Sequence, residues 1–209
     1  MLEIYAGGGN FSSLYDSTKY TIGEIGPGLQ PCWGRGGKHL DSDQFYYGFD
    51  KFSDRGITPQ NLNMRATPDY GVRPDQIVFV NGNAAYGGLS VPDQSLNELI
   101  IVNVFGDRET GPTEEERDAI MVEAARVIKP GMEGSVTVVE TYTPQYSSKD
   151  RLAGDMNRHG LTQTNRGHEG DLNVLELFDS SRGGMRAGSY VGIFRRLLQS
   201  PARVGTKAT

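Results

Sequence analysis

The stretch Glu98–Phe105 reads ELIIVNVF and is apolar at nearly every position. Such a run is typical of a central parallel strand that is covered by helices on both faces. Further along the chain, Ser135–Tyr142 reads SVTVVETY and is rich in β-branched residues. Between them, residues 113–129 show a helical pattern, in which Thr113 and Glu116 have capping-box spacing. Strand, helix and strand in this order predict a βαβ unit and a parallel sheet.

Other short apolar runs extend this pattern in both directions. The expected strands are Leu2–Ala6, Phe45–Phe49, Gln76–Val80, Leu99–Phe105, Ser135–Tyr142, Leu175–Phe178 and Ser189–Phe194. A second helix is expected over residues 148–159. Residues 20–43 are rich in glycine and proline, and we expect there a long irregular loop that serves as a lid. Residues 198–209 are expected to be a flexible tail, and residues 1–209 to form one domain.

Composition excludes several classes of protein. Cys32 is the only cysteine among 209 residues, which rules out a disulfide framework and a Cys-rich zinc site. The net charge is −5 with no basic block, so neither nucleic acid nor an anionic membrane is an expected partner. No apolar run approaches the roughly 20 residues that span a bilayer. No signal-peptide pattern opens the sequence, and we expect a cytoplasmic protein.

Three consecutive glycines follow the first expected strand, in LEIYAGGGNF (Leu2–Phe11). A glycine-rich turn between a strand and a helix lets a ligand approach the backbone closely. Nucleotide-like cofactors bind at such turns, at the carboxyl ends of parallel strands. The next expected strand ends in YYGFD. Its last residue, Asp50, is acidic and can bind ribose hydroxyls.

In these features the chain resembles the class I S-adenosylmethionine-dependent methyltransferases, from Leu2 to about Leu197. The resemblance is carried by LEIYAGGG, YGFD, VNGNAAYGGLSVPDQSLNELIIVNVF and EAARVIKPGMEGSVTVVETY. It implies an α/β fold, a Rossmann-like three-layer sandwich with a mostly parallel seven-stranded sheet and a C-terminal antiparallel strand. It also implies S-adenosylmethionine as the cofactor.

The resemblance assigns the first motif to the start of the chain. Gly7 and Gly9 would lie against the methionine part of the cofactor, and Glu3 would organise their turn. Tyr5 stands where the family usually has its first glycine. Its ring would either crowd the methionine tail or cover it.

The resemblance also assigns the nucleoside contacts. Asp50 would hold the ribose hydroxyls, with Phe49 beside the adenine. Asn83, in place of the more common aspartate, would bind the adenine amino group, and Ala84 would offer its backbone N–H. Asn103 would sit near the sulfonium and the substrate.

Glu24, in YTIGEIG, is a rival to Asp50 for the ribose contact because it lies nearer the spacing of the dinucleotide fingerprint. Asp50 is favoured because YYGFD has the pattern of a strand end.

Methyl transfer needs mainly in-line alignment, so the sequence need not display a catalytic residue. His39 and Asp107 are weak candidates for a base, because each is also explained as an ordinary loop residue. His168, Glu169 and Asp171 lie on one loop and would make a poor metal cage, so no metal is expected.

The stretch NVFGD lacks the Asn/Asp-Pro-Pro-aromatic sequence of enzymes that methylate nucleobase amines. We therefore expect an oxygen or nitrogen atom of a small molecule or peptide as the acceptor. Either residues 20–43 or a partner subunit, including a second copy, would cover the site. Two alternatives stay open: a non-catalytic binding or scaffold subunit with the same fold, and a nicotinamide-dependent oxidoreductase. The second is disfavoured because AGGGNF lacks the G-x-G-x-x-G spacing.

Overall fold

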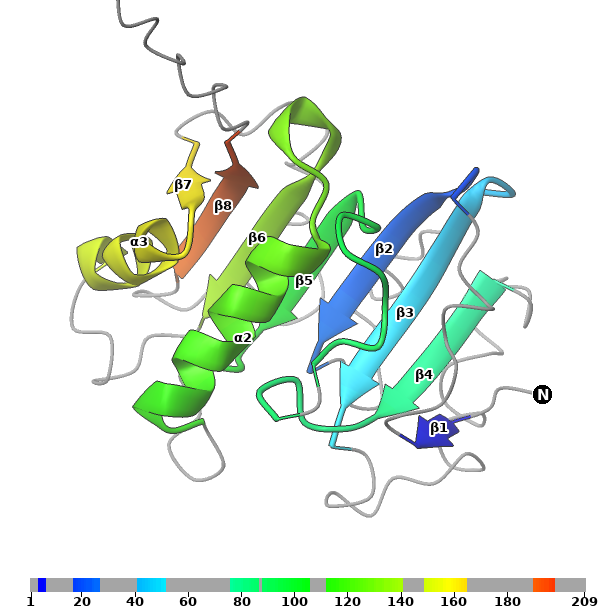
Figure 1. Ribbon diagram of the computed structural model, residues 1–209, viewed down its shortest axis with the longest axis horizontal. Helices are drawn as coiled ribbons and strands as arrows, with labels where there is room; N and C mark the ends of the chain where they lie inside the picture. Colours follow the sequence, from blue (N-terminus) through cyan, green and yellow to red (C-terminus); the bar gives the residue numbers. More distant parts are fainter. Residues whose placement is uncertain are drawn as a thin grey trace, which may run out of the picture.

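The computed structural model describes residues 4–6, 17–26, 41–51, 76–86, 88–105, 112–140, 149–164 and 190–197. Their strands form one eight-stranded sheet with the order β1-β4-β3-β2-β5-β6-β8-β7 (Figure 1). The strands are β1 (Ile4–Ala6), β2 (Tyr20–Ile25), β3 (Gln44–Asp50), β4 (Ile77–Asn81), β5 (Glu98–Val102), β6 (Ser135–Glu140), β7 (Leu161–Gln163) and β8 (Tyr190–Arg196). The helices are α2 (Glu114–Val127), α3 (Lys149–Arg158) and the short 3-10 helix η4 (Gly131–Glu133).

The direction in which the sheet grows reverses at β2. Strands β3 and β4 follow on one side of β2, and β5 and β6 follow on the other, all in parallel. Strand β8 is antiparallel to both β6 and β7. Reversal of strand order creates a topological switch point between β2 and β5, which is where open α/β sheets bind their ligands.

Helix α2 forms as the sequence predicts. Thr113 caps its N-terminus, and the capping box with Glu116 is complete. One face of α2 is buried and belongs to the same apolar cluster as the odd-numbered side chains of β3. The buried residues of α2 are Ile120, Met121, Ala124 and Val127. In Figure 1 the helix crosses the part of the sheet that contains β5 and β6.

Both faces of the sheet are buried. On β3, Phe45, Tyr47 and Phe49 point to the face that packs with α2 and α3. Tyr46 alternates to the other face and is also 0% exposed. A sheet covered on both faces accounts for the nearly continuous apolar runs that identified its strands.

The predicted fold class is confirmed, because the sheet is Rossmann-like and mostly parallel and contains an antiparallel strand, β8, from the C-terminal part of the chain. Its described part has eight strands rather than seven. Helix α3 and strands β3, β4, β5, β6 and β8 lie where the sequence predicts them, within a few residues at their ends. Leu175–Phe178 and the expected tail 198–209 lie outside the described residues.

One prediction about the sheet was wrong, and one expected strand lies at the edge of the sheet. Residues 20–43 do not begin as a loop, because Tyr20–Ile25 is the strand β2 at the switch point. The expected first strand is β1, which pairs only with β4 in the described sheet and lies at its edge (Figure 1). The short strand β7 was also missed. Among the helices of the described ranges, none is long and apolar enough to cross a membrane.

Candidate functional site

The carboxyl ends of β2, β3 and β4 are joined by backbone hydrogen bonds. Gly26 N–H, just after β2, donates to the Phe49 carbonyl oxygen at 2.9 Å. Gly82 N–H, just after β4, donates to the Asp50 carbonyl oxygen at 2.9 Å. Since parallel strands end at the same edge of a sheet, these contacts hold three neighbouring strand ends in fixed positions. These hydrogen bonds therefore hold Phe49, Asp50 and the turn after β4 next to one another at the carboxyl edge of the sheet.

Gly26 is required by its surroundings. Its φ is +79°, a left-handed conformation that side chains disfavour. A Cβ atom at this position would lie 2.9 Å from Cγ2 of Val104 and 3.4 Å from the carbonyl oxygen of Val102. Gly26 thus lets the chain leaving β2 pass close to the chain leaving β5, at the switch point itself.

Glu24 lies inside the sheet just before this turn. Its side chain is 0% exposed, and its Oε2 accepts a 2.7 Å hydrogen bond from the hydroxyl of Tyr46 on the adjacent strand. Asp50 ends β3 and is 7% exposed, with Oδ1 accepting from the Lys51 N–H at 2.7 Å. Of the two rivals for the ribose contact, Asp50 is the one at a strand end.

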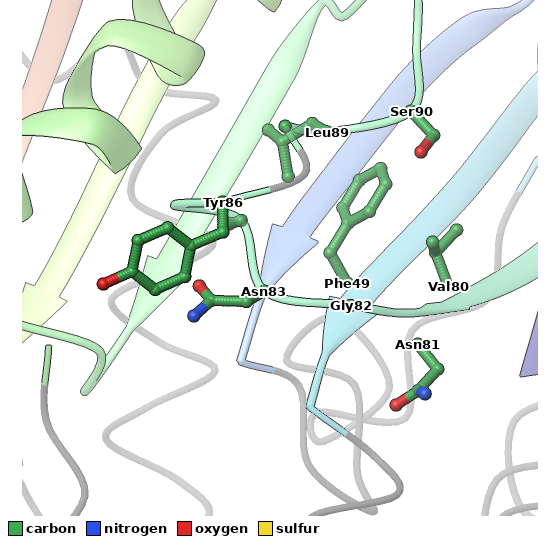
Figure 2. A pocket seen from close by; sticks show the side chains of 10 residues that line it. Phe49, Val80, Asn81, Gly82, Asn83, Tyr86, Leu89 and Ser90 are labelled. Atoms are coloured by element: carbon green, nitrogen blue, oxygen red, sulfur yellow. The ribbon is translucent and has the colours of Figure 1, made fainter. Parts of the chain in front are cut away.

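A pocket of about 480 Å³ opens beyond the ends of β3 and β4. Its walls come from the ends of these strands and from residues 82–84, 86 and 88–90. Figure 2 shows the Phe49 ring between Leu89 and Val80, with the side chains of Asn83 and Tyr86 next to each other. The remaining lining residues are Asn81, Gly82, Ala84, Gly88 and Ser90. An aromatic ring and aliphatic side chains beside an amide suit a flat heterocycle with polar edges.

Asn83 is held at both ends of its carboxamide. Its Oδ1 accepts from the Ala85 N–H at 2.9 Å, and its Nδ2 donates to Oε1 of Glu116 at 3.3 Å. Glu116 belongs to the capping box of α2, where its Oε2 accepts from the Thr113 N–H at 2.7 Å. That backbone hydrogen bond is the main cause that lowers the pKa of Glu116, with smaller contributions from Asn83 and Lys51. The pKa of the exposed Tyr86 is raised by partial desolvation and by the nearby Glu116 carboxylate.

A second contact ties the opposite wall of the pocket to α2. Arg126 donates to Glu123 through Nε (2.9 Å) and Nη2 (2.7 Å), and to the carbonyl oxygens of Val91 (3.0 Å) and Leu89 (2.8 Å). Glu123 in turn accepts from the Leu89 N–H at 2.8 Å. Asp93 completes the group by accepting from Nη1 at 2.7 Å. We call Glu123, Arg126 and Asp93 the α2 clamp, because they fix the backbone of residues 89–93.

The turn after β5 is anchored by a carboxylate from β6. Oε1 of Glu140, which is 5% exposed, accepts from the N–H groups of Val104 (3.0 Å) and Phe105 (2.9 Å). Asn103 starts this turn with a φ of 51° and donates its N–H to the Val139 carbonyl oxygen at 2.8 Å. Asn103 therefore occupies a fixed position at the end of the strand next to β2.

The structure brings together part of the predicted site. Phe49, Asn83 and Ala84 line one pocket, and Asp50 follows Phe49 in the chain but is not among the residues that line this pocket. Tyr5 lies in β1, opposite Val80 in the register with β4, so the predicted first motif starts from the sheet edge and not from the switch point. The strand that ends at the switch point is β2. The other predicted site residues lie outside the described residues: Glu3, Gly7, Gly9, His39 and Asp107. The loop with His168, where no metal is expected, lies outside them as well.

Some residues of this region were not singled out from the sequence. Glu24 was named only as a rival to Asp50, and Gly26 was not named, although YTIGEIGPG places a glycine two residues after an acidic residue at the end of a short apolar run. Glu123, Arg126 and Glu140 gave no such signal, since their roles depend on contacts between distant segments. In the part of the chain that the structure describes, no cluster of His, Cys, Asp and Glu could hold a metal ion.

Comparison with known proteins supports the fold. No family model and no curated protein matches this chain. A TehB-like SAM-dependent methyltransferase from Corynebacterium glutamicum matches with a TM-score of 0.52 and 14% identity, over 85% of this chain and 80% of that one. The 16S rRNA methyltransferase KamB matches with a TM-score of 0.53 and 16% identity, over 90% and 91%.

A third similar structure is phosphoethanolamine N-methyltransferase 2 from Haemonchus contortus, solved in complex with S-adenosyl-L-methionine. It matches with a TM-score of 0.50 and 10% identity, over 87% of this chain and 49% of that one. At these identities the likeness shows the fold, which is that of the class I methyltransferases.

Proposed function

We propose that this chain binds S-adenosylmethionine and transfers its methyl group to an oxygen or nitrogen atom of a small molecule or peptide. The observation that carries the proposal is the position of Asp50 at the end of β3, directly after the pocket residue Phe49 and on the strand adjacent to β2, where the order of the sheet reverses. In open α/β sheets this is where nucleotide-containing ligands bind, with an acidic residue on the ribose. The likeness to solved methyltransferases supports the choice of cofactor.

The residues present fit an adenosyl group. The pocket, of about 480 Å³, has the size of a small-molecule site, and its Phe49 ring offers an apolar face to a base. We assign the ribose hydroxyls to Asp50, whose carboxylate can accept two hydrogen bonds. We assign the edge of the base to Asn83 and to the backbone N–H of Ala84.

The methionine end of the cofactor is assigned to the turn that starts at Gly26. We favour Gly26 over Gly7 and Gly9 for this role, because β2 and not β1 lies at the switch point. Asn103, fixed at the end of β5, then faces the reacting end of the cofactor from the neighbouring strand. The rigid anchoring of its turn by Glu140 suits a residue that positions a reactant.

The sulfonium supplies an activated methyl group, and the acceptor atom displaces the sulfur in line. The protein must hold the acceptor in this line and receive any proton that the acceptor loses. His39 and Asp107 remain the candidate bases. The net charge of −5 favours a small molecule or peptide over nucleic acid, because a phosphate backbone needs cationic residues.

The oxidoreductase alternative loses support. Sheets of the dinucleotide-binding type have the strand order 3-2-1-4-5-6 with parallel strands, whereas β8 runs antiparallel between β6 and β7. The other alternative is a non-catalytic protein of the same fold. It would bind the cofactor without forming product, so a turnover assay distinguishes it from an enzyme.

Two assays test the proposal together. In a thermal unfolding assay, S-adenosylmethionine should raise the Tm in a concentration-dependent way, and NADH should leave it unchanged. Formation of S-adenosylhomocysteine is then measured with pools of small molecules and peptides. Cofactor binding without product would support a binding subunit, and a Tm shift with NADH alone would overturn the proposal.

A further inference from the structure

We propose that Glu116 fixes the orientation of the Asn83 carboxamide and thereby makes the pocket select a purine with a 6-amino group over one with a 6-oxo group. This inference rests on the proposed function, since the purine is the base of the cofactor. Glu116 is a positioning residue here: it acts on the base only through Asn83.

An asparagine differs from an aspartate in having a donor end and an acceptor end. A carboxylate accepts hydrogen bonds through both oxygens, so it presents an acceptor whichever way it turns. Asn83 presents an acceptor to a ligand only if its Oδ1 is held toward the pocket. Something in the protein must therefore distinguish its two orientations.

Two contacts set the same orientation. The Ala85 N–H meets the Asn83 Oδ1 at 2.9 Å, which requires an acceptor at that end. The Glu116 Oε1 lies 3.3 Å from Nδ2, which requires a donor at the other end. Turning the amide over would place NH₂ against N–H and a carbonyl oxygen against a carboxylate. Both new contacts would be repulsive.

Glu116 is itself held in place. Its Oε2 accepts from the Thr113 N–H at 2.7 Å, and its own N–H donates to the Thr113 Oγ1 at 3.2 Å. The hydrogen bond from Thr113 also keeps the pKa of Glu116 below its usual range, so the side chain is ionised and accepts only. The start of α2 thus presents a fixed acceptor to Asn83.

The consequence for the ligand follows from the lone pairs of Oδ1. A carbonyl oxygen can accept two hydrogen bonds, and the Ala85 N–H uses one. Asn83 lines the pocket, and its carboxamide lies on the side of Tyr86 (Figure 2). An exocyclic amino group placed beside it would donate to the second lone pair. A 6-oxo group at the same place would oppose oxygen to oxygen. Sites built to bind a polar group reject an analogue that leaves it unpaired.

The experiment compares S-adenosylhomocysteine with S-inosylhomocysteine, which carries oxygen in place of the 6-amino group. Calorimetric titration at pH 7 gives the ratio of the two Kd values. We expect the wild-type protein to bind the adenosyl compound about 10- to 100-fold more tightly. Glu116→Gln should reduce this ratio several-fold, because a glutamine amide can pair with Asn83 in either orientation and only the Ala85 N–H then opposes the turned amide.

Glu116→Gln is suited to this test because glutamine also serves in capping boxes, so α2 keeps its start. Thr113→Ala is the matched control, since it removes the cap but keeps the carboxylate, and it should leave the ratio close to that of the wild type. The double variant Asn83→Asp with Glu116→Gln should restore the ratio, because an aspartate presents only acceptors. A merely structural role of Glu116 would not produce this rescue.

The outcomes are distinct. If the wild type and Glu116→Gln both bind S-adenosylhomocysteine and have the same ratio, this inference is overturned and the proposed function stands. If Thr113→Ala lowers the ratio as much as Glu116→Gln does, helix capping and not amide orientation is responsible, and the inference is also overturned. If the wild type binds neither compound, the proposed function fails and the inference fails with it.

Discussion

The hydroxyl of Tyr46 donates a 2.7 Å hydrogen bond to Oε2 of Glu24, and both side chains are fully buried. The contact joins β3 to β2 two residues before Gly26, whose backbone turns the chain at the switch point. A buried carboxylate needs such donors, since burial without them is costly. The pair therefore contributes to holding β2 in the centre of the sheet.

Tyr46→Phe removes the hydroxyl and keeps the ring. The free energy of unfolding should fall by about 1–3 kcal/mol, because the buried Glu24 loses a donor. Urea denaturation measures this change. Tyr20→Phe is the control, as Tyr20 is 41% exposed, and it should change the free energy of unfolding by less than about 0.5 kcal/mol. Equal effects of the two substitutions would show that the buried hydrogen bond has no special role.

Gly26→Ala should destabilise the protein, because it places a Cβ atom 2.9 Å from Val104 in a left-handed backbone conformation. The expected loss is about 1–3 kcal/mol in the free energy of unfolding. Gly154→Ala gives the opposite sign. Gly154 lies in α3, and a Cβ atom there would have no neighbour within 4 Å, so alanine should stabilise by about 0.5–1 kcal/mol. If Gly26→Ala left the free energy of unfolding unchanged in the same urea denaturation, a glycine would not be required at this position.

The α2 clamp gives a third prediction. Arg126→Lys loses the planar guanidinium that contacts Glu123, Leu89 and Val91 together, and it should weaken cofactor binding several-fold by loosening the pocket wall. Arg158→Lys is the matched control. Arg158 also forms an ion pair with a carboxylate three residues away, Asp155 at 2.6 Å, but its side chain is 60% exposed against 30% for Arg126. Calorimetry on both variants should show a change only for Arg126→Lys.

Glu116 gives a prediction about pH. Its pKa is lowered in the folded protein, chiefly by the Thr113 N–H. The unfolded chain therefore binds the proton more readily, and the stabilisation is present above the unfolded pKa. It is lost as the pH falls through the folded pKa.

Urea midpoints measured from about pH 7 to pH 3 should fall less steeply for Glu116→Gln than for the wild type, because glutamine does not titrate. Thr113→Ala should have nearly the same pH dependence as the wild type, since alanine keeps the backbone N–H that donates to the Glu116 carboxylate. Parallel curves for all three proteins would contradict this assignment.

Much of the fold could be predicted from the sequence because burial on both faces leaves long apolar runs. ELIIV and SVTVVE became β5 and β6, and the capping box of Thr113 and Glu116 begins α2. These signals are local, and packing reinforces them.

The central strand β2 was missed because its sequence, YTIGEI, contains residues that are unusual inside a sheet. Each has a partner or a neighbour that only the fold supplies. Thr21 donates its hydroxyl to the Ser95 carbonyl oxygen at 2.5 Å, and Glu24 is bound by Tyr46. At Gly23 a Cβ atom would lie 2.7 Å from Leu96, so the strand needs a glycine there.

Because Tyr20–Ile25 was not predicted to be a strand, the first motif was assigned to residues that start in β1, at the edge of the sheet. The nucleoside residues were less affected, since Phe49, Asp50 and Asn83 follow strands that the sequence did identify. The supporting contacts of Glu116, Glu123 and Glu140 join segments distant in the chain, and no local pattern announces them.

The most direct test of the account is calorimetric titration of the protein with S-adenosylhomocysteine. We expect saturable one-to-one binding with a micromolar Kd, which corresponds to about −8 kcal/mol. Asp50→Ala should abolish it, while circular dichroism shows that the variant remains folded. Absence of saturable binding by the wild type at millimolar ligand, or unchanged binding by Asp50→Ala, would contradict the placement of the cofactor at the ends of β2, β3 and β4.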